Sequence, residues 1–298
     1  MNTLYPDHIY YGVGIEWAEA LEAEIIEALP KLSCIELIPE NFFHDRTELL
    51  QKIAESSVPV LVHGVELSIG TAEPLKEKHF ENMLRVAERV NTINFSDHLC
   101  MTEAGGVEIG QLTPLPWTVE CADMVSRKVD QIQRRLGVPF LIENITNRFI
   151  IPGTELSETE FINRITDRTG CGLLLDLNNV YTNSVNFGFD PFAWIDALNL
   201  GAVKTTHLAG GFYDNEGSLI DSHSDVAPKQ VWDLFHYVCE RILPAATIFE
   251  WTDETRGLQP LMKEVTRAEK ILFETRGMKG DLNLGSEKYA MNQERGLR

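Results

Sequence analysis

The sequence has little cysteine and no motif that would pair or cluster it. Its five cysteines, an odd number, are widely spaced and include no Cys-x-x-Cys, which argues against a disulfide framework or a thiolate zinc site and favours a reducing, cytoplasmic location. The chain shows no basic and apolar signal segment at its start, and no run approaches the roughly 18 apolar residues that span a bilayer. We therefore expect a soluble protein without a membrane partner.

Positive charge is also scarce. Lysine and arginine total 26 against 45 aspartates and glutamates, a formal net charge of −19, and this field repels phosphate backbones. Nucleic acid is therefore not an expected partner. The chain also lacks a P-loop, does not extend Gly12-Val13-Gly14 into a dinucleotide fingerprint, and has no Gly-x-Ser-x-Gly elbow. A nucleotide-binding sheet and a serine hydrolase thus have no support.

The chain does contain eight short apolar runs that alternate with longer amphipathic segments. Runs of this kind are typical of parallel strands covered on both faces, so we predict an α/β fold, a (β/α)₈ TIM barrel, with a doubly wound open sheet as the alternative. A single catalytic domain is expected over residues 1–277, followed by a flexible tail over 278–298. The predicted strands cover residues 10–16, 34–39, 59–65, 92–99, 139–145, 172–178, 203–210 and 246–251.

Six predicted strands end in side chains that bind metals. Because the C-terminal ends of barrel strands ring one mouth, where active sites are built, these side chains should converge. A further group, Asp221, His223 and Asp225, occupies alternate positions of "LIDSHSDVAP" in the loop after the seventh strand, and would share one face if that segment is extended. The six strand-end residues are His63, His98, Glu143, Asp176, His207 and Glu250.

Charge balance at this mouth predicts metal ions. Four carboxylates gathered in a low-dielectric site without counter-charge would cost several kcal/mol each, which neutral imidazoles do not offset. About eight candidate ligands exceed the needs of one ion, so more than one is expected. Imidazole with carboxylate suits iron, manganese or zinc. Asn179 could donate an amide oxygen or be a turn residue, whereas Cys100 is interpreted as a small buried hydrophobe.

Three further features lie near the predicted mouth. Asp97 should face the opposite side of its strand from His98 and orient an imidazole from behind. Glu40 is expected to bind either substrate or a ligating histidine. The connection over residues 100–118 is much longer than an ordinary βα loop, which favours a substrate-facing element.

The motifs at these positions resemble those of the multinuclear non-heme iron-dependent oxidative enzymes, formerly a domain of unknown function, whose best-known members resemble the oxidase of methanobactin biosynthesis. The resemblance covers about residues 10–275 and implies a sugar-isomerase-type barrel. The motifs that carry it are "VHG" (62–64), "FSDHL" (95–99), "LIEN" (141–144), "LLLDLNNVYTNSVNFGFDP" (173–191), "THLAGG" (206–211), "IDSHSDV" (220–226) and "FEW" (249–251).

The resemblance also implies a chemistry. Two or three iron ions would use O₂ to modify cysteine residues of a ribosomally made precursor peptide, with a small partner protein presenting the peptide's leader. Glu143, Asp221 and His223 would be catalytic members of the cluster. The alternatives are a sugar isomerase or epimerase, an endonuclease-like enzyme, or a non-catalytic metal-binding or peptide-binding scaffold. The implied metal ligands are His63, His98, Glu143, Asp176 or Asn179, His207, Asp221, His223 and Glu250.

Overall fold

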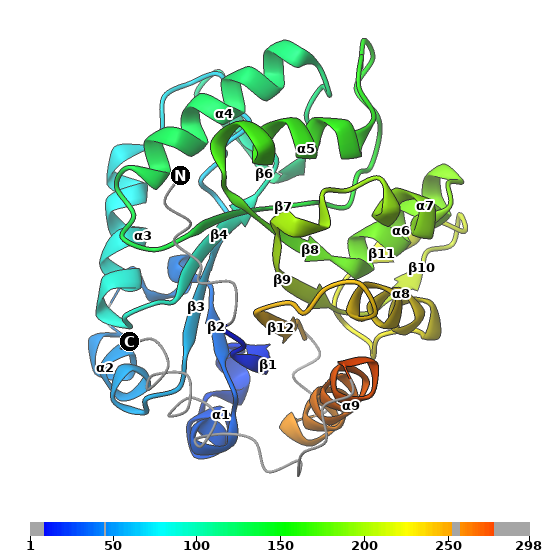
Figure 1. Cartoon of the computed structure of the whole chain (residues 1–298). Coiled ribbons are helices and arrows are strands. Elements are labelled where there is room, and N and C mark those ends of the chain that lie inside the picture. Colours follow the sequence, from blue (N-terminus) through cyan, green and yellow to red (C-terminus); the bar gives the residue numbers. More distant parts are fainter. Residues whose placement is uncertain (1–8, 45, 252–256, 277–298) are drawn as a thin grey trace.

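Eight parallel strands close into a barrel, which confirms the predicted TIM-barrel fold (Figure 1). The computed structural model describes residues 9–44, 46–251 and 257–276, so the predicted tail over 278–298 lies outside the described residues. The barrel closes where Gly12 of the first strand pairs with Ala246 of the last. In barrel order the strands are β1 (Gly12–Glu16), β12 (Ala246–Phe249), β9 (Val203–Leu208), β8 (Gly172–Asp176), β7 (Phe140–Glu143), β4 (Asn94–His98), β3 (Val60–Gly64) and β2 (Ile35–Leu37).

Amphipathic helices surround the barrel and bury their apolar faces against it. Within α3, Phe80, Met83 and Ala87 recur at helical spacing and are buried, as the core-facing stripe of a surface helix requires. No helix of the described ranges is long and apolar enough to cross a bilayer. The helices are α1 (Glu22–Ala28), α2 (Thr47–Glu55), α3 (Glu77–Arg89), α4 (Val119–Gln133), α5 (Glu158–Thr169), α6 (Leu177–Phe187), α7 (Pro191–Asp196), α8 (Lys229–Cys239) and α9 (Leu258–Arg276).

The barrel interior changes character along its axis. Apolar side chains, including Leu61 and Ile248, form a small buried cluster inside it. Since alternate residues of a strand share a face, the next inward position along β3 belongs to His63, and the corresponding position just past the end of β12 belongs to Glu250. Gly14 lets β1 and β2 approach closely, because a Cβ there would lie 2.3 Å from the carbonyl oxygen of Cys34. Sequence alternation thus turns an apolar interior into a polar mouth.

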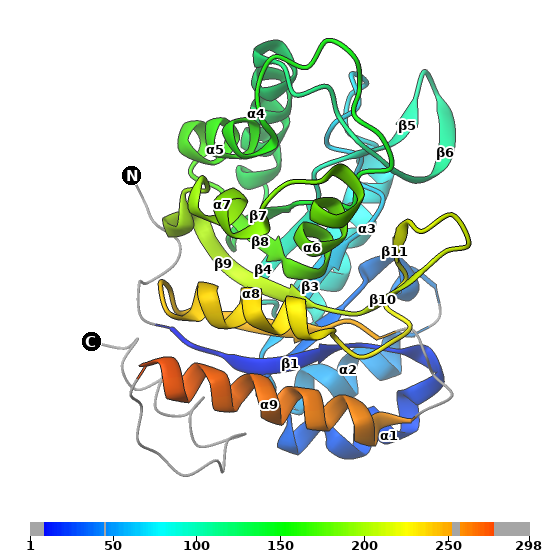
Figure 2. The same ribbon diagram turned by 90° about the vertical axis from the view of Figure 1, so that its right-hand side faces the viewer.

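Two antiparallel hairpins extend the loops at one side of the barrel (Figure 2). The long connection after β4 forms β5 (Met101–Ala104) and β6 (Val107–Thr113), and the connection after β9 forms β10 (Gly211–Tyr213) and β11 (Leu219–Asp221). The sixth predicted strand is shorter than expected. It stops at Asp176, whose side chain accepts the amide of Asn179 and so starts α6 at Leu177.

Candidate metal centre

All six strand-end residues meet at the mouth of the barrel. They form two groups whose potential ligand atoms lie within 4.8 Å of one another, and Glu143 belongs to both. The first group is His63, His98 and Glu143; the second is Glu143, Asp176, His207 and Glu250. The barrel register explains the convergence, since His98 pairs with Glu143 and Asp176 with His207 on neighbouring strands.

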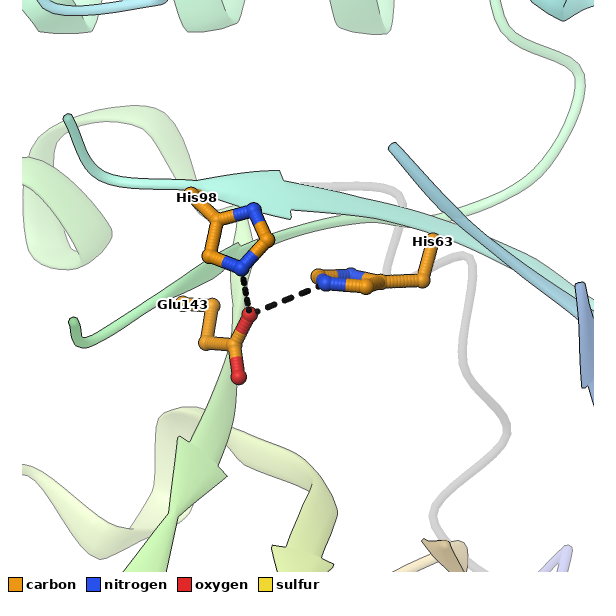
Figure 3. Close-up of side chains that lie close together, drawn as sticks. All are labelled: His63, His98 and Glu143. Carbon is orange, nitrogen blue, oxygen red and sulfur yellow. Dashed lines mark ion pairs between the residues drawn. The ribbon is translucent and has the colours of Figure 1, made fainter. Parts of the chain in front are cut away.

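The first group places two imidazoles on one carboxylate oxygen (Figure 3). Nε2 of His63 lies 3.1 Å and Nε2 of His98 lies 3.2 Å from Oε2 of Glu143. The other ring nitrogens face protein groups: Nδ1 of His63 is 2.9 Å from the Ser96 hydroxyl, and Nδ1 of His98 is 3.2 Å from the Gly64 carbonyl. Such partners fix ring orientation and tautomer, as is usual behind ligating histidines.

This arrangement fits a cation. A carbonyl only accepts, so Nδ1 of His98 must carry a proton, and in the neutral ring the Nε2 lone pair then faces Glu143. Ligand atoms bound to one ion at about 2.1 Å each lie roughly 3 Å apart. Within the described residues, the buried Nε2 of His63 and Oε2 of Glu143 have no hydrogen-bond partner outside this group. Buried polar atoms of this kind are expected where an ion binds.

The second group is richer in carboxylates. Nδ1 of His207 lies 3.2 Å from Oε1 of Glu143 and 3.2 Å from Oε2 of Glu250. One Asp176 oxygen accepts the Asn179 amide, while the other, Oδ2, is buried without a hydrogen-bond partner among the described residues. These atoms could hold a second ion, with Glu143 joining the two groups.

Asn179 occupies a different position from Asp176. Its side-chain Nδ2 donates to the Asn144 carbonyl at 3.0 Å, and its Oδ1 accepts from the Thr146 hydroxyl. Asn144 in turn bonds both the backbone N–H and the carbonyl of Asp176, each at 2.9 Å. Of the two alternatives proposed from the sequence, the geometry places Asp176 in the ligand group and engages both amide atoms of Asn179 elsewhere.

Asp221 and His223 lie over the second group from the β10–β11 hairpin. Nε2 of His223 is 2.8 Å from Oδ1 of Asp221, and its Nδ1 is 3.6 Å from Oε2 of Glu250. The segment is not extended as the alternation suggested, because β11 ends at Asp221 and His223 has a φ of 52°. A turn, rather than a shared strand face, brings the two side chains together. Asp225 instead accepts the amide of Val226.

Two glutamates on β1 and β2 were missed by sequence reasoning. Oε1 of Glu36 lies 2.8 Å from Nε2 of His207, whereas the other ring nitrogen, Nδ1, faces Glu143 and Glu250 of the second group. Glu16 pairs in register with Glu36, and loss of solvent around the carboxyl group, followed by the charge of Glu250, raises the pKa of Glu16. Glu16 is the last residue of β1, so the rule that identified the six strand-end ligands would also have found it, whereas Glu36 lies in the middle of β2 and does not follow that rule.

Glu40 and Asp97 lie outside both groups. Oε1 of Glu40 accepts the amides of Val65 and Glu66 at 3.0 and 3.1 Å and lies 3.3 Å from His79. Asp97 is fully buried, and it packs so closely on β3 that a Cβ at position 64 would lie 2.3 Å from its Oδ2. The expectation that Asp97 orients a ligand ring is wrong, because the groups next to the two rings are Ser96 and the Gly64 carbonyl.

Burial and proximity shift the pKa values of these groups in opposite directions. Although burial opposes it, the Glu143 carboxylate raises the pKa of His63 to about 10, while burial lowers the pKa of His98. Against the cost of burial, the histidines hold the pKa of Glu143 well below its usual range. Burial and the charges of Glu250 and Glu143 raise the pKa of Asp176. Without a metal ion, protons therefore partly balance the charge.

Comparison with known proteins places most of the chain in one group. Residues 12–273 match the family model described as RiPP precursor modification enzyme MbnB/TglH/ChrH. A UPF0276 protein of Anaeromyxobacter sp. (strain Fw109-5) is 35% identical over 264 residues, which cover 88% of this chain and 92% of the relative. A UPF0276 protein of Chromobacterium violaceum is 34% identical, covering 88% and 94% of the two chains.

Solved structures with this fold include sugar-converting enzymes. A xylose isomerase domain protein from Planctomyces limnophilus superposes with a TM-score of 0.59 at 10% identity, covering 91% of this chain and all of that one. D-psicose 3-epimerase gives 0.54 at 14% identity, covering 89% and 98%. At such low identity the likeness establishes the barrel type alone.

Proposed function

Because the chain belongs to the MbnB/TglH/ChrH family of RiPP precursor modification enzymes, we propose that it oxidises cysteine residues of a ribosomally made precursor peptide, using O₂ and two or three iron ions. The observation that carries this proposal is the position of Glu143 in both ligand groups. One carboxylate shared by two buried groups is what a multinuclear centre requires. Imidazole and carboxylate donors without thiolate suit iron, manganese or zinc. The family resemblance favours iron among these metals.

The proposed ligands divide between the two groups. His63, His98 and Glu143 would hold one ion, and Glu143, Asp176, His207 and Glu250 a second, with Asp221 and His223 completing the centre from the hairpin. Bound iron would supply a Lewis acid that favours the thiolate form of the substrate cysteine and a redox centre that reacts with O₂. Glu36 would keep His207 turned toward the ions.

The protein's own cysteines do not contribute to either group. All five are buried, and none belongs to the metal-compatible groups among the described residues. A thiolate bound at the mouth would therefore come from the substrate. The strand-end side chains are largely buried, so the site would also keep water away from the reacting thiol. We further propose a leader-binding partner protein, as the family resemblance implies.

The test is anaerobic reconstitution with Fe(II), followed by addition of O₂ and a candidate cysteine-containing precursor peptide, with a leader-binding partner protein supplied. A mass change confined to the cysteine-bearing part of the peptide is expected, together with stoichiometric iron. Substitution Glu143→Gln should abolish the change. An unmodified peptide under these conditions, with iron bound, would contradict the proposed activity.

A further inference from the structure

A pocket lies between the two hairpins, and its lining includes Asp221 of the candidate metal centre. Its volume is about 440 Å³, within the roughly 300–1,000 Å³ typical of ligand sites. The lining includes Gln111 and Leu112 of β6, Arg148 of the loop after β7, Phe187 of α6, and Leu219 and Asp221 of β11. We call this the hairpin pocket. The long connection after β4, expected to face substrate, thus supplies one wall.

The hairpin that carries β11 is fixed against α6. Asn186 of α6 bonds both the backbone N–H and the carbonyl of Leu219, each at 2.9 Å, and so fixes β11 to the barrel. Asp221 lies at the inner end, where it accepts from Asn178 at 2.8 Å and contacts His223. A molecule that fills this pocket would therefore contact the hairpin side of the candidate metal centre.

Arg148 is the only basic residue among the described residues that line the pocket. Its side chain is exposed and has no ion pair within the described part of the chain. The two acidic residues of the lining are engaged: Asp214 accepts the amides of Glu216 and Ser218 at 2.9 Å each, and Asp221 contacts Asn178 and His223. In a chain of net charge −19, Arg148 is thus the positive charge at this pocket that an anionic group could pair with.

We propose that the hairpin pocket binds the precursor peptide beside the modified cysteine, and that Arg148 pairs with a carboxylate of that peptide. This inference rests on the proposed function for the identity of the ligand as a peptide. Apolar side chains next to Arg148 in the chain, Phe149 and Ile150, are each 48% exposed, and Phe187 is 36% exposed. They would cover apolar parts of the same segment, while the guanidinium selects its charge.

The geometry also limits where that carboxylate can be. Thr146 contacts Asp221 at 3.3 Å, and Arg148 follows two residues later, a step of at most about 7 Å. An extended peptide advances about 3.3 Å per residue, and we place the paired carboxylate within a few residues of the cysteine. It can be an aspartate or glutamate side chain, or the peptide's own C-terminus.

Binding of synthetic probes tests this without turnover. Three hexapeptides with cysteine at the second position and a neutral fluorophore are titrated anaerobically against the Fe(II)-loaded full chain: one with a free C-terminus, one amidated with aspartate at the fifth position, and one amidated with asparagine there. We expect a carboxylate-bearing peptide to bind about tenfold more tightly than the neutral one. Which of the two does so identifies the carboxylate as side chain or terminus.

Variants then assign the preference to Arg148. Arg148→Gln should reduce carboxylate binding to the level of the neutral peptide, and Arg148→Lys should retain part of it. Arg127→Gln makes the same charge change at an exposed position of α4 and should have no effect. Equal binding of all three peptides, no binding of any, or equal losses in the Arg148 and Arg127 variants would overturn the inference. Because O₂ is absent, a failure of the proposed oxidation would leave these results unaffected.

Discussion

The strand-end ligands and the hairpin pair differ in how the fold holds them. On the strands, His63, Glu143 and His207 have side chains at most 2% exposed, whereas those of Asp221 and His223 are 18% and 21% exposed. Strand ligands are fixed by the register of a closed barrel, but His223 depends on a left-handed backbone at φ 52°, which costs a non-glycine residue about 1–2 kcal/mol. We call the six strand-end ligands the wall and the pair Asp221 and His223 the closure. The comparison indicates that the wall is formed by the barrel itself, whereas the closure depends on contacts of its own side chains.

The largest effect should follow from substitution of Glu143, the residue that belongs to both ligand groups. Glu143→Gln leaves both groups without their shared carboxylate, so we expect metal content below one ion per chain and activity reduced by at least about 100-fold. Elemental analysis after reconstitution measures the first, and peptide mass spectrometry the second. Glu158→Gln, a buried glutamate bonded to Asn147 and Trp194, is the control and should keep its metal. Full metal content in Glu143→Gln would reject a shared ligand.

Removing the metal tests whether the wall is preformed. The barrel register does not depend on ions, so the metal-free chain should stay folded. A ligand present at about 100 times its dissociation constant stabilises the folded state by about 2.7 kcal/mol. At about 2.1 cal/mol/K of unfolding entropy per residue, chelation should therefore lower the melting temperature of this 298-residue chain by about 4 °C for each ion lost. Differential scanning calorimetry with and without chelator measures this, and circular dichroism checks the fold. Loss of the fold on chelation would mean that metal, rather than register, builds the wall.

The pH dependence of metal binding should reflect the wall histidines. In the metal-free protein the pKa of His63 is raised to about 10, so near neutral pH a bound metal must displace its proton. Affinity should therefore rise with pH, by up to about tenfold per unit for each proton released. The raised pKa of His63 also stabilises the metal-free folded state. This contribution is fully present below the unfolded pKa of about 6.5 and is lost as pH rises through about 10. Calorimetric titration in buffers of different ionisation enthalpy counts the protons released when the metal binds. Release of no proton would contradict the assignment of His63 as a metal ligand.

The wall could be predicted from the sequence because its rule is local. A polar residue at the end of an apolar strand is visible without a structure, and β/α alternation fixes where such ends meet. Glu36 was overlooked because it precedes further apolar residues rather than ending the run. The contact of His223 with Asp221 was expected for the wrong reason, since no residue pattern shows a positive φ at a histidine. The pocket beside Arg148 needed the packing of two hairpins, which sequence spacing does not specify.

The smallest effect should distinguish the backbone strain at His223 from the contribution of its imidazole. His223→Ala and His223→Gly both remove the imidazole, so both should weaken the hairpin side of the metal centre equally. Glycine tolerates the φ of 52° and alanine does not, so the glycine variant should be more stable by about 1 kcal/mol, net of its greater chain entropy when unfolded.

Chemical denaturation of the metal-free variants measures this difference. Asp225 provides the matched control, because it lies two residues further along the same loop and is not among the residues with positive φ. There the order should reverse, with Asp225→Ala more stable than Asp225→Gly, since only the entropy difference remains. An alanine variant at 223 as stable as the glycine variant would mean that the loop relaxes freely when the imidazole is lost. In that case the contacts of His223 with Asp221 and Glu250 alone hold the closure in place. The wall and the closure would then differ in their side-chain contacts and not in backbone strain.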